Sequence, residues 1–344
     1  MIVETQDIAP GARISRVLRG GWQLAGGHGP VERDRAISDM RAFLDAGITS
    51  FDCADIYTGV EEMIGEFRAS LPASEQDRLR VHTKFVPDWS DLGRIDRAYV
   101  ARIIDRSRAR LGVPALDLVQ FHWWNLAVPG LVETALHLAA LRQAGAIRAV
   151  GGTNFAAAET AMMLDAGVPI ASMQVQYSLL DRRPAGAMAA LAAARGFHLL
   201  CYGTLAGGFL TERWLGQPDP AEISNRSLIK YRLIIEEFGG WDAFQSLLRT
   251  LQAIGRRHGV SIGAVATRWV LDQPAVAGAI VGARYAAHLP ETLSVFGFRL
   301  DAADHAALAP LLAAHPGPQG EVYALERDRD GPHGRIMKYD LNKV

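Results

Sequence analysis

The fold is decided by residues 37–52, which read ISDMRAFLDAGITSFD. In the first half of this stretch, Ile37, Met40 and Leu44 recur at the spacing of one face of an α-helix. Gly47 follows them, and glycine readily takes the left-handed backbone conformation in which helices end. The short apolar run after Gly47 is typical of a buried strand. The stretch therefore predicts a helix that leads directly into a strand.

Similar helix-to-strand stretches follow at residues 100–121 and 138–151. The candidate strands are Val17–Trp22, Thr49–Asp52, Val81–Lys84, Leu116–Phe121, Ile147–Gly151, Ala171–Val175, His198–Tyr202 and Ala277–Val281. Eight such strands alternating with helices predict an α/β fold, a (β/α)8 TIM barrel, because closure leaves no sheet edge exposed. A doubly wound open sheet is the alternative. Residues 20–29, GGWQLAGGHG, lack the G-x-G-x-x-G turn expected after its first strand.

The composition is typical of one large soluble domain. The chain has 344 residues, and we expect a single barrel domain over residues 1–344 with a core at about 15–315. Its 36 Lys and Arg balance 37 Asp and Glu, which argues against nucleic-acid and membrane partners. Two cysteines and the lack of an apolar leader or a long apolar run favour a reducing cytoplasm. The sequence favours neither a monomer nor a homo-oligomer.

Two segments interrupt the alternation of strands and helices. Residues 204–240 are long for a connection between a strand and a helix, and their paired glycines predict a loop that closes over a ligand. Residues 316–344 form a polar C-terminal tail. For the tail, a position near the active-site face and a frayed terminus are both open.

Polar residues stand at the ends of three neighbouring candidate strands. Asp52 ends the second strand, Lys84 ends the third, and His122 follows the fourth, while Tyr57 lies in the loop after Asp52. Active sites of (β/α)8 barrels form at this end of the strands, so we expect the four side chains to converge. A tyrosine phenol has a pKa of about 10, and a buried ammonium beside it would lower that pKa. The set predicts an acid–base tyrosine tuned by Lys84, with Asp52 keeping the lysine charged.

Five segments of the chain carry these residues and their neighbours in a fixed order. They are Phe51–Tyr57 (FDCADIY), His82–Phe85 (HTKF), Ser107–Gly112 (SRARLG), Asp117 with Phe121–Trp123 (FHW), and Val150–Phe155 (VGGTNF). Over about residues 20–293, the chain resembles the aldo-keto reductase superfamily. The resemblance implies reduction of an aldehyde or ketone by hydride from NAD(P)H. It also implies that Tyr57 is the general acid, that Lys84 and Asp52 tune it, and that His122 donates to or orients the carbonyl oxygen.

The resemblance further implies a nicotinamide cofactor site. Three residues match the positions that hold the carboxamide: Thr153, Asn154 and Gln174. Tyr202 matches the ring that stacks on the nicotinamide. The pyrophosphate loop falls on Gly203, Leu205, Gly207 and Gly208, where absent side chains would let backbone N–H groups approach anionic oxygens. A mobile turn is the alternative for these glycines.

The remaining cofactor positions implied by the resemblance are Gly21, Trp22, Gly282, Arg284, His288 and Glu291. Arg284, with a weaker contribution from His288, offers a cation for a 2′-phosphate. Gly282 and Thr292 stand where some relatives carry Lys and Asn. NADP(H) is therefore favoured, and NAD(H) remains an alternative.

The expected substrate is a small carbonyl or alcohol compound held by aromatic residues. The candidates are Trp22, Trp123 and Trp124, with packing at the barrel end as the alternative role. Cys53 and Cys201 are expected to fill space. No metal is expected, because the first strand does not end in the His-x-His pair of metal-dependent barrel hydrolases.

Two other functions stay open at this stage. The same four residues run in reverse would make an NAD(P)⁺-dependent aldose or alcohol dehydrogenase, with the phenolate of Tyr57 as base. A cofactor-binding regulatory subunit similar to potassium-channel beta subunits is a hypothesis of another class. Turnover of carbonyl compounds separates the regulatory hypothesis from the two enzymatic ones.

Overall fold

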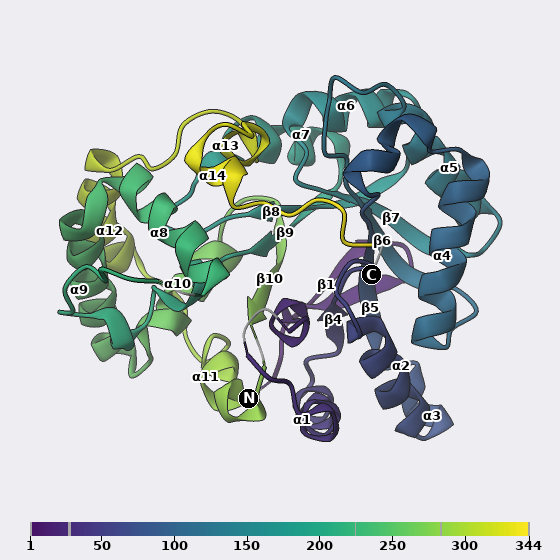
Figure 1. Cartoon of the computed structure of the whole chain (residues 1–344). Coiled ribbons are helices and arrows are strands. Elements are labelled where there is room, and N and C mark those ends of the chain that lie inside the picture. The colour runs from purple at the N-terminus through teal and green to yellow at the C-terminus, as the bar shows by residue number, and fades with distance from the viewer. Residues whose placement is uncertain (1, 27–28, 224, 283, 343–344) are drawn as a thin grey trace.

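Eight parallel strands close into a barrel at the centre of the molecule (Figure 1). The computed structural model describes residues 2–26, 29–223, 225–282 and 284–342. The strands run in the order β10-β3-β4-β5-β6-β7-β8-β9 around the barrel. Their bounds are β3 Val17–Gly20, β4 Ser50–Asp52, β5 Arg80–Phe85, β6 Leu116–Phe121, β7 Ile147–Thr153, β8 Ile170–Gln176, β9 His198–Tyr202 and β10 Val276–Gly282. The predicted TIM barrel is confirmed, and the doubly wound sheet is wrong.

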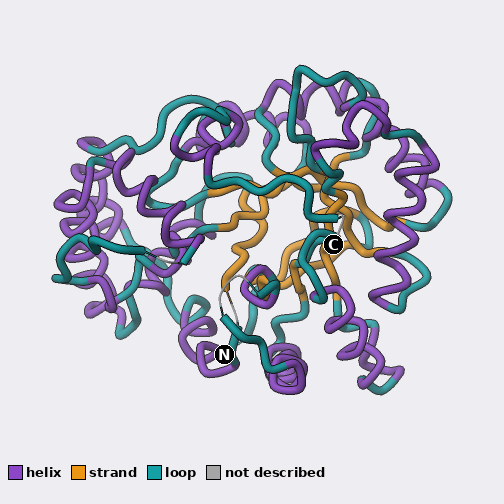
Figure 2. The backbone as a smooth tube through the Cα atoms, viewed as in Figure 1, coloured by secondary structure: helices purple, strands orange, loops and turns teal. Residues whose placement is uncertain are grey.

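Helices surround the strands, as Figure 2 shows with purple helices outside an orange barrel. They are α1 Arg33–Asp45, α2 Val60–Ser70, α3 Ala73–Gln76, α4 Arg97–Leu111, α5 Leu131–Gln143, α6 Ala157–Asp165, α7 Ala187–Arg195, α8 Arg226–Phe238, α9 Gly240–His258, α10 Ile262–Leu271, α11 Leu289–Ser294, α12 Ala302–Ala314, α13 Ala324–Arg327 and α14 Pro332–Arg335. Short 3-10 helices are η1 Trp22–Leu24, η2 Trp89–Arg94, η3 Arg183–Ala185, η4 Ala206–Gly208, η5 Glu212–Trp214 and η6 Ala286–His288. In α1, Met40 and Leu44 are buried, and Gly47 follows the helix with a φ of 91°. The predicted step from helix to strand is confirmed.

The first barrel strand is shorter than predicted. It ends at Gly20, and Trp22 begins η1 instead of continuing the strand. Gly21 has φ −89° and ψ −10°, which turns the chain out of the sheet. Its N–H still donates to the carbonyl oxygen of Asp52 at 2.7 Å. The turn holds Trp22 at the carboxyl end of the barrel.

An antiparallel hairpin that the sequence analysis did not predict precedes the barrel. It consists of β1 Thr5–Ala9 and β2 Ala12–Ser15. Ile8 and Ile14 of the hairpin are buried together with Leu18 and Leu118 of the barrel strands. The hairpin therefore covers the amino-terminal end of the barrel, and the carboxyl end is left for a site.

The predicted loop at 204–240 is only partly a loop. It contains η4 and η5, and its last third is the helix α8. The side chains Tyr231, Ile234, Ile235 and Phe238 of α8 are buried at helical spacing. The side chain of Asn225 caps the helix by accepting hydrogen bonds from two backbone N–H groups. A packed helix, rather than a free loop, thus faces the barrel mouth.

The C-terminal tail is anchored at both ends of its path. Glu326 is buried and forms an ion pair with Arg183 at 3.3 Å. The amide nitrogen of the Asn342 side chain donates to the carbonyl oxygen of Val86 at 2.7 Å. In Figure 1 the yellow tail runs from α13 and α14 toward β5 and β6.

The frayed terminus left open for the tail is therefore wrong over its described part. Buried charges and hydrogen bonds fix the tail across the carboxyl end of the barrel. Residues 343–344 of the predicted tail lie outside the described residues.

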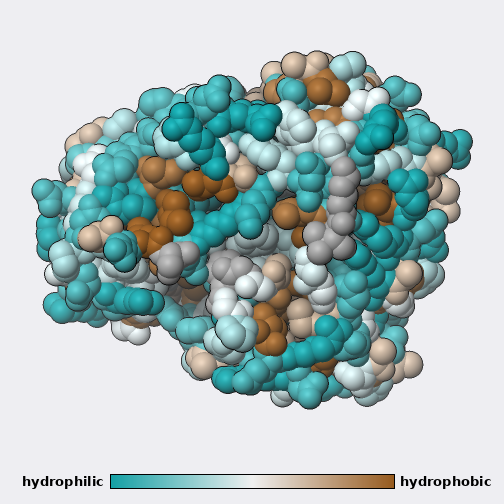
Figure 3. All heavy atoms as spheres, viewed as in Figure 1, coloured by the Kyte–Doolittle hydropathy of each residue, from teal (hydrophilic) through white to brown (hydrophobic). Residues whose placement is uncertain are grey.

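Hydrophilic residues cover most of the face shown in Figure 3, and hydrophobic residues form smaller groups. The large apolar side chains that are exposed are Ile2, Leu126, Leu136 and Met162. Within the described parts of the chain, no helix combines the length and apolar character needed to span a bilayer. Both Cys53 and Cys201 are buried free thiols, in keeping with the expected space-filling role.

Candidate active site

A cavity of about 730 Å³ lies at the carboxyl end of the barrel strands. Asp52 ends β4, Lys84 lies near the end of β5, and His122 directly follows β6. Tyr57 lies in the connection from β4 to α2, where its N–H donates to the carbonyl oxygen of Ala54 at 3.0 Å. The structure brings all four predicted catalytic side chains to this one cavity.

Asp52 and Lys84 form a buried ion pair. The Lys84 ammonium lies 2.9 Å from Asp52 Oδ2 and donates to the carbonyl oxygen of Cys53 at 2.8 Å. Burial lowers the pKa of Lys84, but the Asp52 carboxylate together with Tyr57 and Cys53 outweighs this effect, and the net pKa is raised above its ordinary value. Lys84 therefore stays charged at neutral pH, as predicted.

Two buried glutamines hold the other oxygen of Asp52. Gln120 Nε2 donates to Asp52 Oδ1 at 3.1 Å, and Gln174 Nε2 donates to the same oxygen at 2.6 Å. Gln174 Nε2 also donates to Gln120 Oε1 at 3.0 Å. Lys84 and Gln120 are partners in the register of β5 and β6, which brings them to the same level of the barrel. The carboxylate is thereby fixed from three strands.

Tyr57 packs between aromatic and cationic neighbours. Its ring centroid is 5.0 Å from that of Trp22 and 5.2 Å from Lys84 Nζ. Burial raises the pKa of Tyr57, and the Lys84 ammonium opposes that rise without cancelling it. The lowering of the phenol pKa by Lys84 expected from the sequence is therefore present, but desolvation of the phenolate outweighs it, and the net pKa is raised.

His122 presents an unpartnered nitrogen. Its Nδ1 lies 3.0 Å from the carbonyl oxygen of Thr153. Its Nε2 is buried and has no hydrogen-bond partner among the described residues. Burial, reinforced by the Arg327 guanidinium, lowers the pKa of His122 to about 3, so the ring is neutral.

The hydrogen bond to Thr153 fixes the tautomer of His122. A carbonyl oxygen only accepts hydrogen bonds, so the proton of the neutral ring resides on Nδ1. Nε2 then offers a lone pair. In this tautomer Nε2 can accept a hydrogen bond and cannot donate one to a carbonyl oxygen, which differs from the donor role considered from the sequence.

The three residues predicted to hold a carboxamide, Thr153, Asn154 and Gln174, line the same cavity, as does Tyr202, which was predicted to stack on the nicotinamide. The Tyr202 hydroxyl donates to Asn154 Oδ1 at 2.9 Å, which leaves the Asn154 amide N–H groups as donors. The Gln174 amide nitrogen is already committed to Asp52 and Gln120, which leaves Gln174 Oε1 as an acceptor. One donor and one acceptor together match a primary amide.

The predicted pyrophosphate loop also lines the cavity, including Leu205 and the three glycines. Gly203, Gly207 and Gly208 have φ values of 72°, 67° and 102°, a backbone region that side chains disfavour. A Cβ at Gly203 would lie 2.3 Å from the Tyr231 hydroxyl oxygen. The loop takes this path because α8 packs directly on it.

The predicted adenosine end is only partly assembled around the cavity. Gly282, His288 and Glu291 line it. Arg284 is not among the lining residues, since its guanidinium donates to the carbonyl oxygen of Pro30. The cation considered for a 2′-phosphate thus lies beside the cavity rather than in its wall.

Of the three tryptophans predicted to contact substrate, two point into the cavity and one points away from it. Trp22 and Trp124 line the cavity. Trp123 does not line it; this side chain is fully buried, and its indole N–H donates to the carbonyl oxygen of Val128 at 3.1 Å. Successive residues in extended chain point to opposite sides, so Trp123 points away where His122 and Trp124 point inward. Gly21 is also absent from the lining, because its backbone turns into a hydrogen bond with Asp52.

Sequence analysis missed several lining residues: Gln23, Thr204, Arg226, Lys230, Tyr323 and Lys338. Thr204 lies inside the predicted glycine loop, and its buried Oγ1 has no partner among the described residues. The residues of α8 and the tail were hidden by the interpretation of both segments as loops. The helical spacing of the apolar residues in α8 is the sequence signal that could have placed Arg226 and Lys230 on a helix.

The comparisons with known proteins agree with this geometry. A model of the Aldo/keto reductase family matches residues 16–313. Aldo-keto reductase YhdN of Bacillus subtilis is 30% identical over 305 residues, which cover 86% of this chain and 88% of that protein. L-glyceraldehyde 3-phosphate reductase of Escherichia coli is 28% identical over 299 residues, which cover 82% and 84%.

Solved structures show the same likeness. The glycerol dehydrogenase of Gluconobacter oxydans aligns with a TM-score of 0.77 at 27% identity, covering 92% of this chain and 97% of that chain. A thermostable aldo-keto reductase at 24% identity has a TM-score of 0.71 and shares the fold. This chain belongs to the aldo/keto reductase family.

Proposed function

We propose that this oxidoreductase reduces an aldehyde or ketone to an alcohol with a reduced nicotinamide cofactor, and that Tyr57 is the general acid. The observation that carries the proposal is the position of the Tyr57 phenol. It lies beside the buried Asp52–Lys84 pair, in a cavity that also receives the unpartnered Nε2 of His122. A proton donor, a fixed charge and a lone pair thus line the same cavity.

The donor set fits a nicotinamide cofactor. Asn154 offers amide N–H groups and Gln174 offers Oε1, the complement of a carboxamide. The hydroxyl oxygen of Thr204 is buried and unpartnered among the described residues, beside glycines that keep the backbone bare. When bound, the reduced cofactor supplies a hydride to the carbonyl carbon.

The side chains of this protein then supply the proton that the carbonyl oxygen receives. The Tyr57 hydroxyl, protonated because its pKa is raised by burial, donates to the carbonyl oxygen and delivers its proton as the alcohol forms. The Lys84 ammonium, held by Asp52, stabilises the phenolate that this transfer leaves behind. His122 Nε2 accepts a hydrogen bond from a hydroxyl group of the bound alcohol.

We propose NADP(H) as the preferred cofactor and NAD(H) as the alternative. His288 lines the cavity and Arg284 lies beside it, so a 2′-phosphate at that end would meet positive charge once the Arg284 side chain leaves Pro30. We also propose that residues 1–344 work as one domain, because the tail helps to enclose the cavity, and that the protein resides in the cytoplasm, where its buried thiols stay reduced.

The reverse reaction is the second candidate, and one comparison favours it. The aligned Gluconobacter oxydans structure is a glycerol dehydrogenase. Oxidation of an alcohol would use the same groups, with the Tyr57 phenolate accepting the hydroxyl proton. The regulatory-subunit hypothesis has no such support.

The test is a screen of aldehydes, ketones and sugars with NADPH and NADH, and of sugars and alcohols with NADP⁺ and NAD⁺, followed by absorbance of the reduced cofactor. The proposal predicts multiple turnovers of at least one carbonyl compound and a lower KM for NADPH than for NADH. Turnover confined to alcohols would favour the dehydrogenase. Cofactor binding without turnover in any arm would contradict both and favour a regulatory subunit.

A further inference from the structure

Part of the cavity carries cations that the proposed proton transfer does not use. α8 contributes Arg226 and Lys230, and the tail contributes Lys338. All three residues line the cavity together with the predicted catalytic side chains. Their positions show which region of a bound ligand they would meet.

Arg226 lies one aromatic ring away from Tyr57. Its guanidinium carbon is 6.0 Å from the ring centroid of Trp22, which in turn is 5.0 Å from that of Tyr57. Its Nε and Nη2 both donate to the carbonyl oxygen of Ile336, at 3.2 and 3.0 Å. Among the described residues, Nη1 has no hydrogen-bond partner, so a held guanidinium keeps donors for a ligand.

Lys230 lies one aromatic ring away from His122. Its Nζ is 6.0 Å from the ring centroid of Tyr323, and that ring is 5.6 Å from the His122 ring. Nζ is also 3.4 Å from Glu326 Oε1, but the same carboxylate pairs with Arg183 at 3.3 Å. Arg183 also pairs with Asp181 at 2.7 Å, so two carboxylates balance the two cations, and the Lys230 ammonium lines the cavity as one member of this buried network.

The acids that line the cavity, among the described residues, do not offset these cations. They are Asp52, Glu212 and Glu291. Asp52 is neutralised by its ion pair with Lys84. Glu212 accepts from the backbone N–H of Ile262 at 2.6 Å, and Glu291 from the neighbouring Ser261 hydroxyl at 2.8 Å, both at the start of α10. Arg226 and Lys338 therefore line the cavity without an acid paired to them among the described residues.

We propose that the substrate is a carbonyl compound with an anionic group, a carboxylate or a phosphate, which Arg226 and Lys230 bind while the carbonyl oxygen meets Tyr57. This inference rests on the proposed function. A guanidinium suits either anion, because its parallel N–H groups match two oxygens at once. One aromatic ring separates Arg226 from Tyr57, and one separates Lys230 from His122. This spacing suits a substrate with a short carbon chain between its carbonyl and its anionic group.

The test compares matched aldehydes with and without an anionic group. Succinic semialdehyde is set against butanal, and glyceraldehyde 3-phosphate against glyceraldehyde, each with saturating NADPH. A charge-assisted contact with a guanidinium predicts that wild-type kcat/KM favours the anionic member by about 10- to 100-fold. Arg226→Met should remove most of that preference and leave kcat/KM for the neutral member within about threefold, and Arg226→Lys should restore part of it.

Two measurements keep the outcome distinct. Because Arg226 also holds the tail, Lys230→Met provides a second variant, and thermal melting reports whether either variant is folded. Arg226 and Lys230 could instead bind the phosphates of the cofactor. Titration of NADPH fluorescence measures the Kd for NADPH in each variant and tests this alternative. If Arg226→Met and Lys230→Met weaken NADPH binding and leave the anion preference unchanged, the substrate proposal is overturned.

The remaining outcomes distinguish failure of the anion site from failure of the proposed reductase function. Wild-type protein that reduces neutral members as well as anionic ones overturns the anion site and leaves the reductase function intact. Wild-type protein that reduces none of the four aldehydes, nor any compound of the wider screen, overturns the proposed reductase itself.

Discussion

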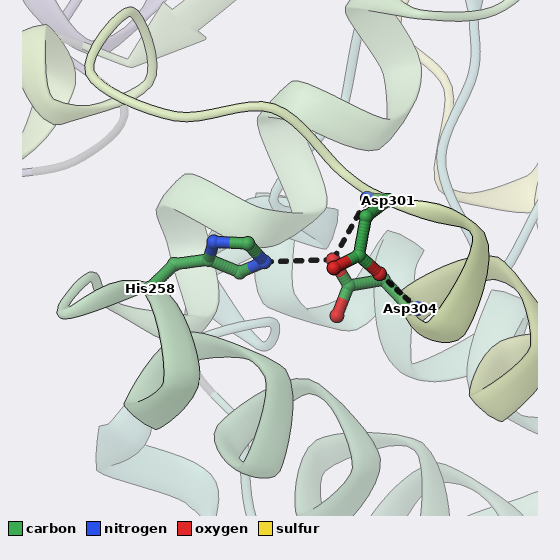
Figure 4. Close-up of side chains that lie close together, drawn as sticks. All are labelled: His258, Asp301 and Asp304. Carbon is green, nitrogen blue, oxygen red and sulfur yellow. Dashed lines mark hydrogen bonds and ion pairs between the residues drawn. The ribbon is translucent and has the colours of Figure 1, made fainter.

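Two clusters of acids and bases in this chain have similar compositions and different surroundings. At the barrel mouth, Asp52 pairs with Lys84 beside a cavity. On the outside of the barrel, Asp304 accepts from His258 Nε2 at 2.7 Å, and Asp301 lies next to it (Figure 4). The second cluster has the residue types of a metal site.

The outer cluster is saturated by protein donors. Arg257 donates to Asp304 Oδ1 at 3.0 Å and to Asp301 Oδ2 at 2.7 Å. The two aspartates also accept from each other's backbone N–H groups, which forms the capping box of α12. Every carboxylate oxygen therefore has a donor, and a guanidinium lies where a cation would bind. This cluster joins α9 to α12 and has no structural sign of a ligand.

Around the inner cluster, the Asp52–Lys84 pair at the barrel mouth, some polar atoms have no protein partner within the described part of the chain. His122 Nε2 and Thr204 Oγ1 are buried without partners among the described residues, and both residues line the cavity. Unpaired buried polar atoms are costly, so two such atoms in the wall of one cavity suit the proposed ligand. The comparison teaches that residue type alone does not distinguish the two clusters, whereas unsatisfied atoms beside a cavity do.

Among the variants that compare the two clusters, the largest effect should follow from removing the inner cation. We expect Lys84→Met to lower kcat for aldehyde reduction by about 10²- to 10³-fold, because the Tyr57 phenolate loses its ammonium and Asp52 is left unpaired. Steady-state assays with folding checked by circular dichroism measure this. Arg257→Met removes the outer cation and should leave kcat within about twofold. An equal loss of kcat in Lys84→Met and Arg257→Met would contradict the difference between the two clusters.

The second prediction concerns pH. His122 has a pKa of about 3 and Tyr57 has a raised pKa, so neither changes protonation near neutrality. Reduction should therefore be flat from about pH 6 to 9. Alcohol oxidation needs the phenolate and should rise up to about tenfold per pH unit over the same range. A pH profile of kcat in both directions checks this, and a step near the ordinary pKa of histidine would contradict the neutral His122.

The fold was predictable because its signals are local. The alternation of helical faces and apolar runs places each barrel strand within two residues of its observed ends. Asp52, Lys84 and His122 meet because parallel strands carry their carboxyl ends to one side. Trp123 was misplaced because its direction depends on how the chain leaves β6, which residue type does not reveal.

The parts that were not predictable depend on distant contacts. Gln120 appears in the sequence as one polar residue in an apolar strand, and its role emerges only through Asp52 and Gln174. The tail is fixed by Glu326, whose partner Arg183 is far away in the sequence. The net pKa of Tyr57 required the degree of burial, since desolvation and Lys84 act in opposite directions.

The third prediction tests Gln120 as a positioning residue. Gln120→Leu removes the bridge between Asp52 and Gln174, so we expect kcat to fall about tenfold and the Kd for NADPH to rise severalfold. Fluorescence titration and steady-state kinetics measure both. Thr160→Val is a matched control, because Thr160 is fully buried in α6 and bonds only within its helix among the described contacts. A loss of stability with unchanged kcat and Kd would reduce Gln120 to a packing role.

The smallest effect on activity is expected at the outer cluster. Asp304→Asn should lower the free energy of unfolding by about 1–3 kcal/mol, because a buried carboxylate that pairs Arg257 and His258 becomes neutral. Activity should not change. Urea denaturation measures the shift, and Asp105→Asn, an exposed acid paired with Arg108, should change stability by less than about 0.5 kcal/mol. Loss of kcat in Asp304→Asn without unfolding would show that the outer cluster serves the reaction.

The most direct test of the central claim is Tyr57→Phe, measured for both turnover and cofactor binding. The ring remains beside Trp22 and only the hydroxyl is lost. If Tyr57 is the proton donor, kcat for aldehyde reduction falls by about 10²- to 10⁴-fold, while the Kd for NADPH stays within about threefold of wild type. A variant that binds NADPH normally and reduces the aldehyde at the wild-type rate would contradict the account.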